Sequence, residues 1–140
     1  MIFFNLLLII NFEIMGLVYA KIKLSNPRKP ELLPIELTSL VDSGVMHLCI
    51  PEAVAFQLEL ETHELRNVQT ADEKTHSLPY VGPIRVDFEN RFCFVGAMVI
   101  GNETLLGAVP MEDMDLIIHP AKQTLTVNPM SPNKPLYKIK

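Results

Sequence analysis

The stretch Leu40-Val41-Asp42-Ser43-Gly44-Val45 is the most informative part of this 140-residue sequence. Two aliphatic residues lead into a carboxylate, a hydroxyl and a glycine, and the apolar run Met46–Ile50 follows. Asp-Ser-Gly can form an ordinary turn, in which Asp and Ser bond to nearby backbone N–H groups and Gly takes a positive φ. Here the tripeptide stands between two apolar runs with strand character, so it carries the carboxylate toward the low-dielectric interior. A plain turn and a buried, reactive carboxylate are therefore both open interpretations.

Strand patterns dominate the chain outside this loop. Val18–Leu24 alternates apolar and polar residues, as a half-buried strand does. Pro51 at a first helical turn and Glu52 near the positive end of the dipole predict a short helix, Pro51–Leu58. The other expected elements are Leu32–Leu40 with Leu33, Ile35 and Leu37 on one face, Met46–Ile50, a hairpin of Glu64–Thr70 and Thr75–Val81, a hairpin of Ile84–Phe88 and Phe92–Ile100 with a bulge at Gly96, Leu105–Gly107, a helical turn at Pro110–Met114, Leu116–Ile118 and Leu125–Val127. Many short strands with one or two small helices predict an all-β domain that closes into a small, mostly antiparallel barrel.

With these elements in this order, the chain resembles the retropepsin-like aspartic proteases of clan AA, in their small prokaryotic single-domain form. The resemblance rests on the hydrophobic-hydrophobic-Asp-Ser-Gly loop and on Ile50-Pro51-Glu52 opening a helix. It continues through Glu103-Thr104-Leu105-Leu106-Gly107, which is similar to the second hydrophobic-hydrophobic-Gly motif of that family. Together with a polar hairpin placed like a flap, these motifs cover the chain from about Gly16 to Pro129.

The resemblance implies an aspartic-type endopeptidase that acts on peptide or protein substrates without a metal or cofactor. Asp42 alone among the aspartates is followed by Ser or Thr and Gly, so a pair of catalytic carboxylates requires a homodimer with Asp42 from each copy. In the family, the hydroxyl at the place of Ser43 locks the two loops together, and Gly44 lets backbone N–H groups approach the carboxylates. The support beneath the loop is then Leu105, Leu106 and Gly107, and the flap over the substrate is Ala71, Asp72, Glu73, Lys74, Thr75 and His76.

Two features depart from the family pattern. Val45 stands where alanine is more usual, and the expected flap tip, Asp72-Glu73-Lys74, lacks the usual glycine. The alternative function is a catalytically silent dimerisation or peptide-binding module that keeps the fold. Such a module would not need Asp42, and the intact Asp-Ser-Gly argues against it.

Composition narrows the partners and the compartment. The net charge is −4, with 12 Lys and Arg against 16 Asp and Glu, and no basic cluster supplies a nucleic-acid-binding face. Two cysteines cannot build a disulfide framework, so we expect a reducing, cytoplasmic setting with Cys49 and Cys93 buried as inert thiols. The four histidines have no spacing typical of zinc ligands. The cysteines and histidines are therefore weaker functional candidates than the carboxylate loop.

Met1–Ile14 is almost wholly apolar and has three interpretations. It can be an extraneous extension, with folding or translation starting at Met15. It can be a membrane anchor, which needs about 20 apolar residues and would be the chain's only membrane contact. It can also be a signal peptide, although no Lys or Arg precedes Lys21. The expected organisation is this extension, a protease-like domain over residues 15–129 and a proline-containing tail over residues 130–140, loose or packed on a partner.

Overall fold

The structure is a computed structural model that describes residues 17–139, in which nine strands and two short helices are found. In chain order they are β1 (Tyr19–Ser25), β2 (Ile35–Val41), β3 (Leu48–Ile50), α2 (Glu52–Gln57), β4 (Glu61–Gln69), β5 (Thr75–Phe88), β6 (Arg91–Val99), β7 (Leu105–Leu106), α3 (Ala108–Asp113), β8 (Leu116–His119) and β9 (Thr124–Val127). No helix within these residues is long and apolar enough to cross a membrane. The expectations for Met1–Ile14 lie outside the described residues.

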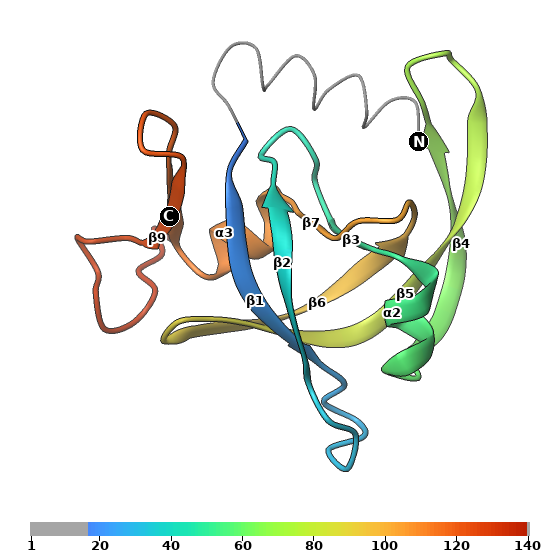
Figure 1. The fold of residues 1–140 in the computed structure, drawn as a ribbon, viewed down its shortest axis with the longest axis horizontal. Helices are drawn as coiled ribbons and strands as arrows, with labels where there is room; N and C mark the ends of the chain where they lie inside the picture. Colours follow the sequence, from blue (N-terminus) through green and yellow to red (C-terminus); the bar gives the residue numbers. More distant parts are fainter. Residues whose placement is uncertain (1–16, 140) are drawn as a thin grey trace.

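Seven of the strands form one sheet in the order β1-β2-β7-β3-β6-β5-β4, and β8 pairs with β9 separately (Figure 1). The pairings are antiparallel except for β2 with β7 and β3 with β6. In addition, β1 pairs with β5 through Lys23–Ser25 and Arg85–Asp87, so the sheet curls and brings its first strand to its sixth. The predicted all-β class with one or two short helices is confirmed. Closure into a barrel and dimerisation remain predictions.

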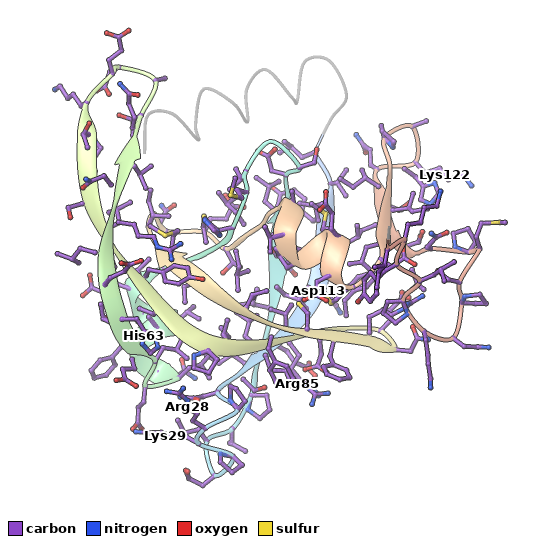
Figure 2. The ribbon with its side chains drawn as sticks, turned by 180° about the vertical axis from the view of Figure 1, so that it is seen from behind. Arg28, Lys29, His63, Arg85, Asp113 and Lys122 are labelled. Atoms are coloured by element: carbon purple, nitrogen blue, oxygen red, sulfur yellow. The ribbon has the colours of Figure 1, made fainter. Side chains whose placement is uncertain are left out.

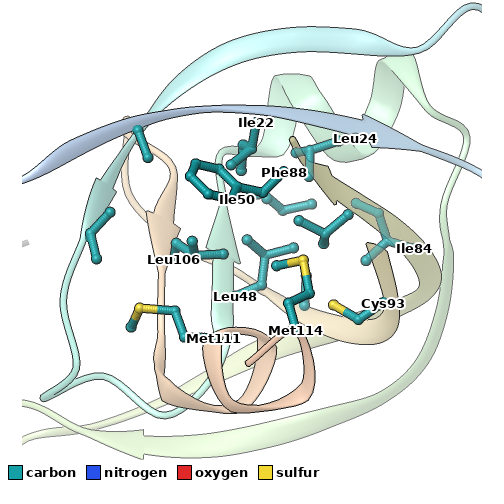
Figure 3. Packing of buried hydrophobic residues seen from close by; sticks show 14 of the residues in the cluster. Ile22, Leu24, Leu48, Ile50, Ile84, Phe88, Cys93, Leu106, Met111 and Met114 are labelled. Atoms are coloured by element: carbon teal, nitrogen blue, oxygen red, sulfur yellow. The ribbon is translucent and has the colours of Figure 1, made fainter. Parts of the chain in front are cut away.

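The main hydrophobic core fills the space that the curled sheet encloses. Along β1 the side chains of Ala20, Ile22 and Leu24 are buried while those between them are exposed, as the alternating pattern predicts. These residues meet apolar side chains from β3, β5, β6, β7 and α3, among them Met111 and Met114 (Figure 3). The core therefore joins the first strand, β1, to the helix that follows β7.

Two strands begin later than the sequence predicts. The second strand starts at Ile35, not Leu32, and Leu33 is 84% exposed. Pro34 explains the difference, because a proline has no N–H to give to a sheet ladder. The third strand starts at Leu48, and Met46 is 63% exposed. The four residues Gly44–His47 thus belong to the loop that follows Asp42.

The bulge expected at Gly96 lies on the neighbouring strand. Val81 pairs with Ala97 and Ile84 pairs with Val95, so the extra residue is in the Gly82-Pro83 segment of β5, opposite Gly96. Gly82 has a φ of +148°, which lets the backbone bend there. One half of the long strand β5 can therefore pack on the core, while the other half forms one arm of the β4–β5 hairpin.

The C-terminal segment packs on its own chain, contrary to the expectation of a loose or partner-bound tail. Asp115 accepts hydrogen bonds from Asn128 Nδ2 at 3.1 Å, from the Ser131 hydroxyl at 2.5 Å and from the Leu136 N–H at 3.0 Å. The buried Arg91 side chain also donates to the Ser131 carbonyl. Polar contacts, which leave no hydrophobic pattern in a sequence, hold this segment.

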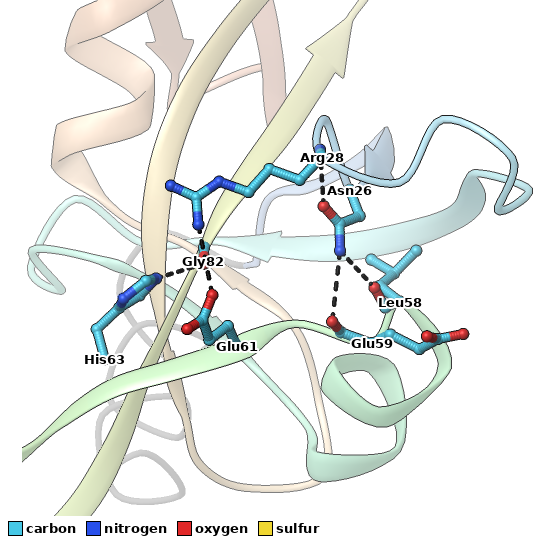
Figure 4. Close-up of polar contacts among 7 residues, drawn as sticks. All are labelled: Asn26, Arg28, Leu58, Glu59, Glu61, His63 and Gly82. Atoms are coloured by element: carbon cyan, nitrogen blue, oxygen red, sulfur yellow. Dashed lines mark hydrogen bonds and ion pairs between the residues drawn. The ribbon is translucent and has the colours of Figure 1, made fainter.

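A group of hydrogen bonds fixes the base of the β4–β5 hairpin (Figure 4). The buried Asn26 side chain donates to the carbonyl of Leu58 at 2.9 Å, and its own oxygen accepts the Arg28 N–H at 2.9 Å. His63 Nε2 lies 2.6 Å from the Gly82 carbonyl, where β4 has a register shift. Figure 2 shows His63 at the start of this hairpin, well away from its tip. These contacts anchor the hairpin at its base.

Candidate active site

Asp42 lies directly after β2, at the end of a parallel strand pair. Leu40 and Val41 pair with Leu105 and Leu106 of β7, and the Asp42 N–H continues the ladder by donating to the Leu106 carbonyl at 3.1 Å. This ladder delivers the carboxylate into the protein, where Asp42 is only 8% exposed. Burying a carboxylate almost completely costs free energy unless hydrogen bonds or a paired group compensate for the lost hydration.

The loop holds one oxygen of that carboxylate. Asp42 Oδ1 accepts the Gly44 N–H at 2.9 Å, and the Val45 N–H donates to the Asp42 carbonyl at 3.2 Å. Within residues 17–139 the structure shows no hydrogen bond to Oδ2. The carboxylate is therefore oriented through one oxygen, and the other remains available.

Gly44 allows this contact because it has no Cβ beside Asp42, and not because its backbone is left-handed. Among the described glycines, the positive φ values are at Gly82 and Gly101, so the positive φ expected of an ordinary turn at Gly44 is wrong, while the bond from Asp42 to a nearby N–H that the same interpretation expects is present. A Cβ on Gly44 would lie 3.1 Å from Asp42 Oδ1, tighter than nine in ten real Cβ contacts. Ser43 and Gly44 are both exposed, and the Ser43 hydroxyl makes no hydrogen bond within the described part of the chain.

The expected support, Leu105-Leu106-Gly107, lies directly behind the loop. A Cβ on Gly107 would come within 3.0 Å of the carbonyl oxygens of both Val45 and His47. This close approach lets α3 begin against the loop, with the Ala108 N–H donating to the Val45 carbonyl at 2.7 Å and the Val109 N–H to Met46 at 2.9 Å. The loop after Asp42 is thus tied to β7 and to the first turn of α3.

A pocket of about 180 Å³ opens between the loop and the β4–β5 hairpin. Its lining is mostly apolar and consists of Gly44, Val45, Met46, His47, Cys49, Val68, Gln69, Thr70, Leu78, Met98 and Ile100. Val45, Cys49, Met98 and Ile100 belong to a second apolar cluster, packed beside the main core around Leu40 and Leu105. An apolar side chain of a bound chain segment fits such a lining.

The hairpin tip, Ala71–His76, is exposed throughout. Glu73 has a φ of +65° and donates its N–H to the Thr70 carbonyl at 2.9 Å, so it occupies the left-handed position that a glycine usually fills. The Asp72 carboxylate accepts the Thr70 hydroxyl and the Lys74 N–H, and the Thr70 contact is the main reason that its pKa is lowered. Side-chain hydrogen bonds therefore shape this tip in place of a glycine.

Electrostatics around the loop favour neutral neighbours for Asp42. Burial, and next the Asp42 charge, raise the pKa of Cys49 to about 12, while burial and the Asp113 charge do the same for Cys93. Burial and the nearby Arg66 charge lower the pKa of His47. The prediction that both thiols are buried is confirmed. Among residues 17–139, no three His, Cys, Asp or Glu side chains come together as metal ligands.

Two residues at this site carry no signal in the sequence. The Arg66 guanidinium lies over the Tyr80 ring, 3.6 Å from its centroid, and the His47 ring meets Tyr80 edge-on at 5.9 Å. Both Arg66 and Tyr80 stand in ordinary strand patterns. Only the pairing of β4 with β5 and the path of the loop bring them to His47.

Comparison with known proteins gives similarity at the level of structure only. No protein-family model and no curated protein sequence matches the chain. The solved structure of the simian foamy virus (mac) protease is 16% identical, with a TM-score of 0.42, and the match covers 65% of this chain and 90% of that one. A foamy viral protease–reverse transcriptase in complex with double-stranded DNA is also 16% identical, with a TM-score of 0.43, over 65% of this chain and 14% of that one. Both are foamy viral proteins, so they lend no support to the expected prokaryotic form.

Proposed function

We propose that the protein is an aspartic-type endopeptidase that acts as a homodimer. The observation that carries the proposal is the Asp42 carboxylate, almost buried, held through Oδ1 by the Gly44 N–H and with Oδ2 unbonded within the described residues. Each chain supplies one such carboxylate, so a catalytic pair needs Asp42 from two copies at a two-fold axis. Closure of the curled sheet into a barrel belongs to the same proposal.

The chemistry follows from two facing carboxylates. Like charges so close cannot both ionise, so the pair shares one proton and its pKa values belong to the pair. The ionised carboxylate takes a proton from a water molecule, and the water oxygen attacks the peptide carbonyl carbon. The protonated carboxylate donates to the carbonyl oxygen, which becomes a hydroxyl of the tetrahedral intermediate. As the C–N bond breaks, the carboxyl that took the water proton gives it to the amine, and the other carboxylate takes a proton back from one hydroxyl as the carbonyl re-forms. The products are a free carboxyl and a free amino end, and the pair again holds one proton.

The surrounding residues have supporting roles in this proposal. Ser43, exposed and unbonded within the described residues, is free to bond the partner's loop. Leu105, Leu106 and Gly107 hold the loop from behind, as their ladder and close approach favour. The hairpin tip Ala71–His76 closes over the substrate and excludes water. Two buried free thiols suit a reducing, cytoplasmic compartment, which we include in the proposal.

The test combines detection of cleavage with subunit mixing. We expect the protein to cut members of an unbiased peptide library and a statine-type inhibitor to block the cutting. Asp42→Ala should abolish cleavage, whereas Asp87→Ala, which removes a carboxylate paired with Arg85 on β5, should retain it. After exchange of equal amounts of wild type and Asp42→Ala, random pairing leaves about one quarter of the activity if both carboxylates are needed, and about one half if the single Asp42 of each chain acts independently.

Three results would contradict the proposal. One half of the activity after verified exchange would refute a shared pair. Cleavage by Asp42→Ala would place the chemistry elsewhere. A wild-type protein that binds peptides or dimerises but cuts nothing would instead support the catalytically silent module.

A further inference from the structure

Tyr80 occupies a position that connects the β4–β5 hairpin with the loop after Asp42. It lies on β5, paired with Glu64 of β4 on one side and with Met98 of β6 on the other. Its side chain is partly buried against the second apolar cluster, which contains Val45 of the loop. Three separate contacts converge on its ring, from β4, from β6 and from the loop.

The contact with β6 explains why the residue at position 96 is a glycine. A Cβ on Gly96 would lie within 3.0 Å of three Tyr80 atoms, Cζ, Oη and Cε1. Gly96 has no positive φ, so space for the ring is what the structure requires of it. The Tyr80 ring therefore lies flush on the backbone of β6 at a place where any larger residue would displace it.

The contacts from β4 and from the loop are specific in geometry. The Arg66 guanidinium carbon is 3.6 Å from the Tyr80 ring centroid, and Arg66 Nε donates to Glu64 Oε1 at 2.8 Å, which orients the guanidinium. A cation over an aromatic face at this distance is attractive. The His47 ring approaches the Tyr80 ring edge-on with an interplanar angle of 61°, the arrangement that aromatic quadrupoles favour.

His47 is itself held in place by its neighbours in the site. Its carbonyl lies against Gly107, and its ring borders, with Tyr80 and Asp113, a hollow of about 300 Å³ beside α3. The charged and titratable groups around it are Arg66 on β4, Asp113 on α3 and Cys49 on β3. Tyr80 thus connects a fixed point of the catalytic loop with the charged side chain of the outer hairpin strand.

We propose that Tyr80 is a positioning residue that holds the β4–β5 hairpin over the loop after Asp42, with Arg66 and His47 as its two partners. The inference rests on the proposed function where it concerns turnover, but the position of the hairpin is measurable without turnover. The hairpin is anchored at its base by Asn26 and His63. The Tyr80 contacts add an attachment at the next residue pair, Glu64 with Tyr80, and so set the angle at which the hairpin leaves the sheet toward a substrate.

The test uses variants that alter the ring without altering the carboxylate. Tyr80→Phe keeps the ring and should preserve the hairpin position and kcat/KM. Tyr80→Leu removes the aromatic contacts, and Gly96→Ala displaces the ring while leaving Tyr80 in place. Both should speed amide hydrogen exchange of residues 69–76 about tenfold, because ring contacts of this kind contribute that much. Tyr137→Leu, an equal change on the C-terminal segment, is the matched control.

Two further readouts separate positioning from a merely structural role. In Tyr80→Leu and Gly96→Ala the KM for a cleaved peptide should rise and kcat should fall, and amide exchange should speed up at residues 69–76 more than in the core strands. The pKa of His47, followed by NMR, should rise in Tyr80→Leu, since burial and Arg66 both lower it in the wild type. Unchanged exchange at residues 69–76 in both variants, or equal losses in Tyr80→Phe and Tyr80→Leu, would overturn the inference. If the wild type cuts nothing, the proposed function fails, while exchange and the His47 titration still decide the role of Tyr80.

Discussion

Gly107 lies where the chain passes from β7 into α3, and its replacement by alanine tests how the loop after Asp42 is held. Its backbone is extended, with a φ of −89° and a ψ of −173°, so alanine meets no backbone strain there. The new Cβ would lie 2.5 Å from the Val45 carbonyl oxygen and closer still to that of His47. Both obstacles are backbone atoms, which a side-chain rotation cannot move aside. The loop and the first turn of α3 must therefore separate until these contacts exceed 3.0 Å.

The magnitude follows from what this separation breaks. The hydrogen bonds from the Ala108 and Val109 N–H groups to the loop, at 2.7 and 2.9 Å, are each worth about 1 kcal/mol net. Overpacking in a buried region adds about 1–3 kcal/mol. We expect Gly107→Ala to lower the free energy of unfolding by about 3–5 kcal/mol. Urea denaturation measures this loss, with the m-values of variant and wild type compared to confirm that stability alone has changed.

Gly44→Ala is the matched control on the other side of the same loop. Its Cβ would meet a single side-chain oxygen, Asp42 Oδ1, at 3.1 Å, and Gly44 is exposed. We expect a loss below about 1 kcal/mol in stability, since one side-chain contact can adjust, together with a clear loss of any peptidase activity. A Gly107→Ala protein within about 0.5 kcal/mol of wild type would refute the reasoning, because that is the range of surface substitutions that touch nothing.

Three further predictions concern the hairpin tip, the C-terminal segment and a thiol. Glu73→Gly should slow amide exchange at the tip, with up to about 1 kcal/mol gained from relief of the left-handed backbone, whereas Lys74→Gly, with no positive φ to relieve, should speed it. Asp115 has a pKa lowered from 3.8, chiefly by its hydrogen bond from the Ser131 hydroxyl. Its contribution to tail attachment is therefore complete above that value and lost as the pH falls through the lower folded pKa; protease nicking of residues 130–139 should follow this profile in the wild type and not in Asp115→Asn. Cys49, with a pKa near 12, should resist iodoacetamide at pH 8 in the folded protein and react in urea; rapid folded-state labelling would contradict its burial.

Sequence periodicity by itself determined the strands whose apolar residues alternate or run together. Val18–Leu24 and the hairpin of Ile84–Phe88 with Phe92–Ile100 were predictable because one buried face leaves a period of two in the chain, whereas β4 has no buried residue. The short helix after Pro51 was predictable from its proline and acidic start, and the structure has it at Glu52–Gln57. The Asp-Ser-Gly loop was recognisable because a carboxylate between two apolar strands is unusual. The roles of its residues remain proposals.

Tertiary structure alone decided the features that depend on residues far apart in the chain. The C-terminal segment is held by Asp115 and Arg91 through single polar contacts, and such contacts leave no periodic pattern. The bulge lies at the Gly82-Pro83 segment and not at Gly96, where the glycine instead leaves space for the Tyr80 ring. A sequence records which side chains are apolar along one strand. The fit of a ring from β5 on a glycine of β6, beneath an arginine of β4, exists only once those three strands are paired.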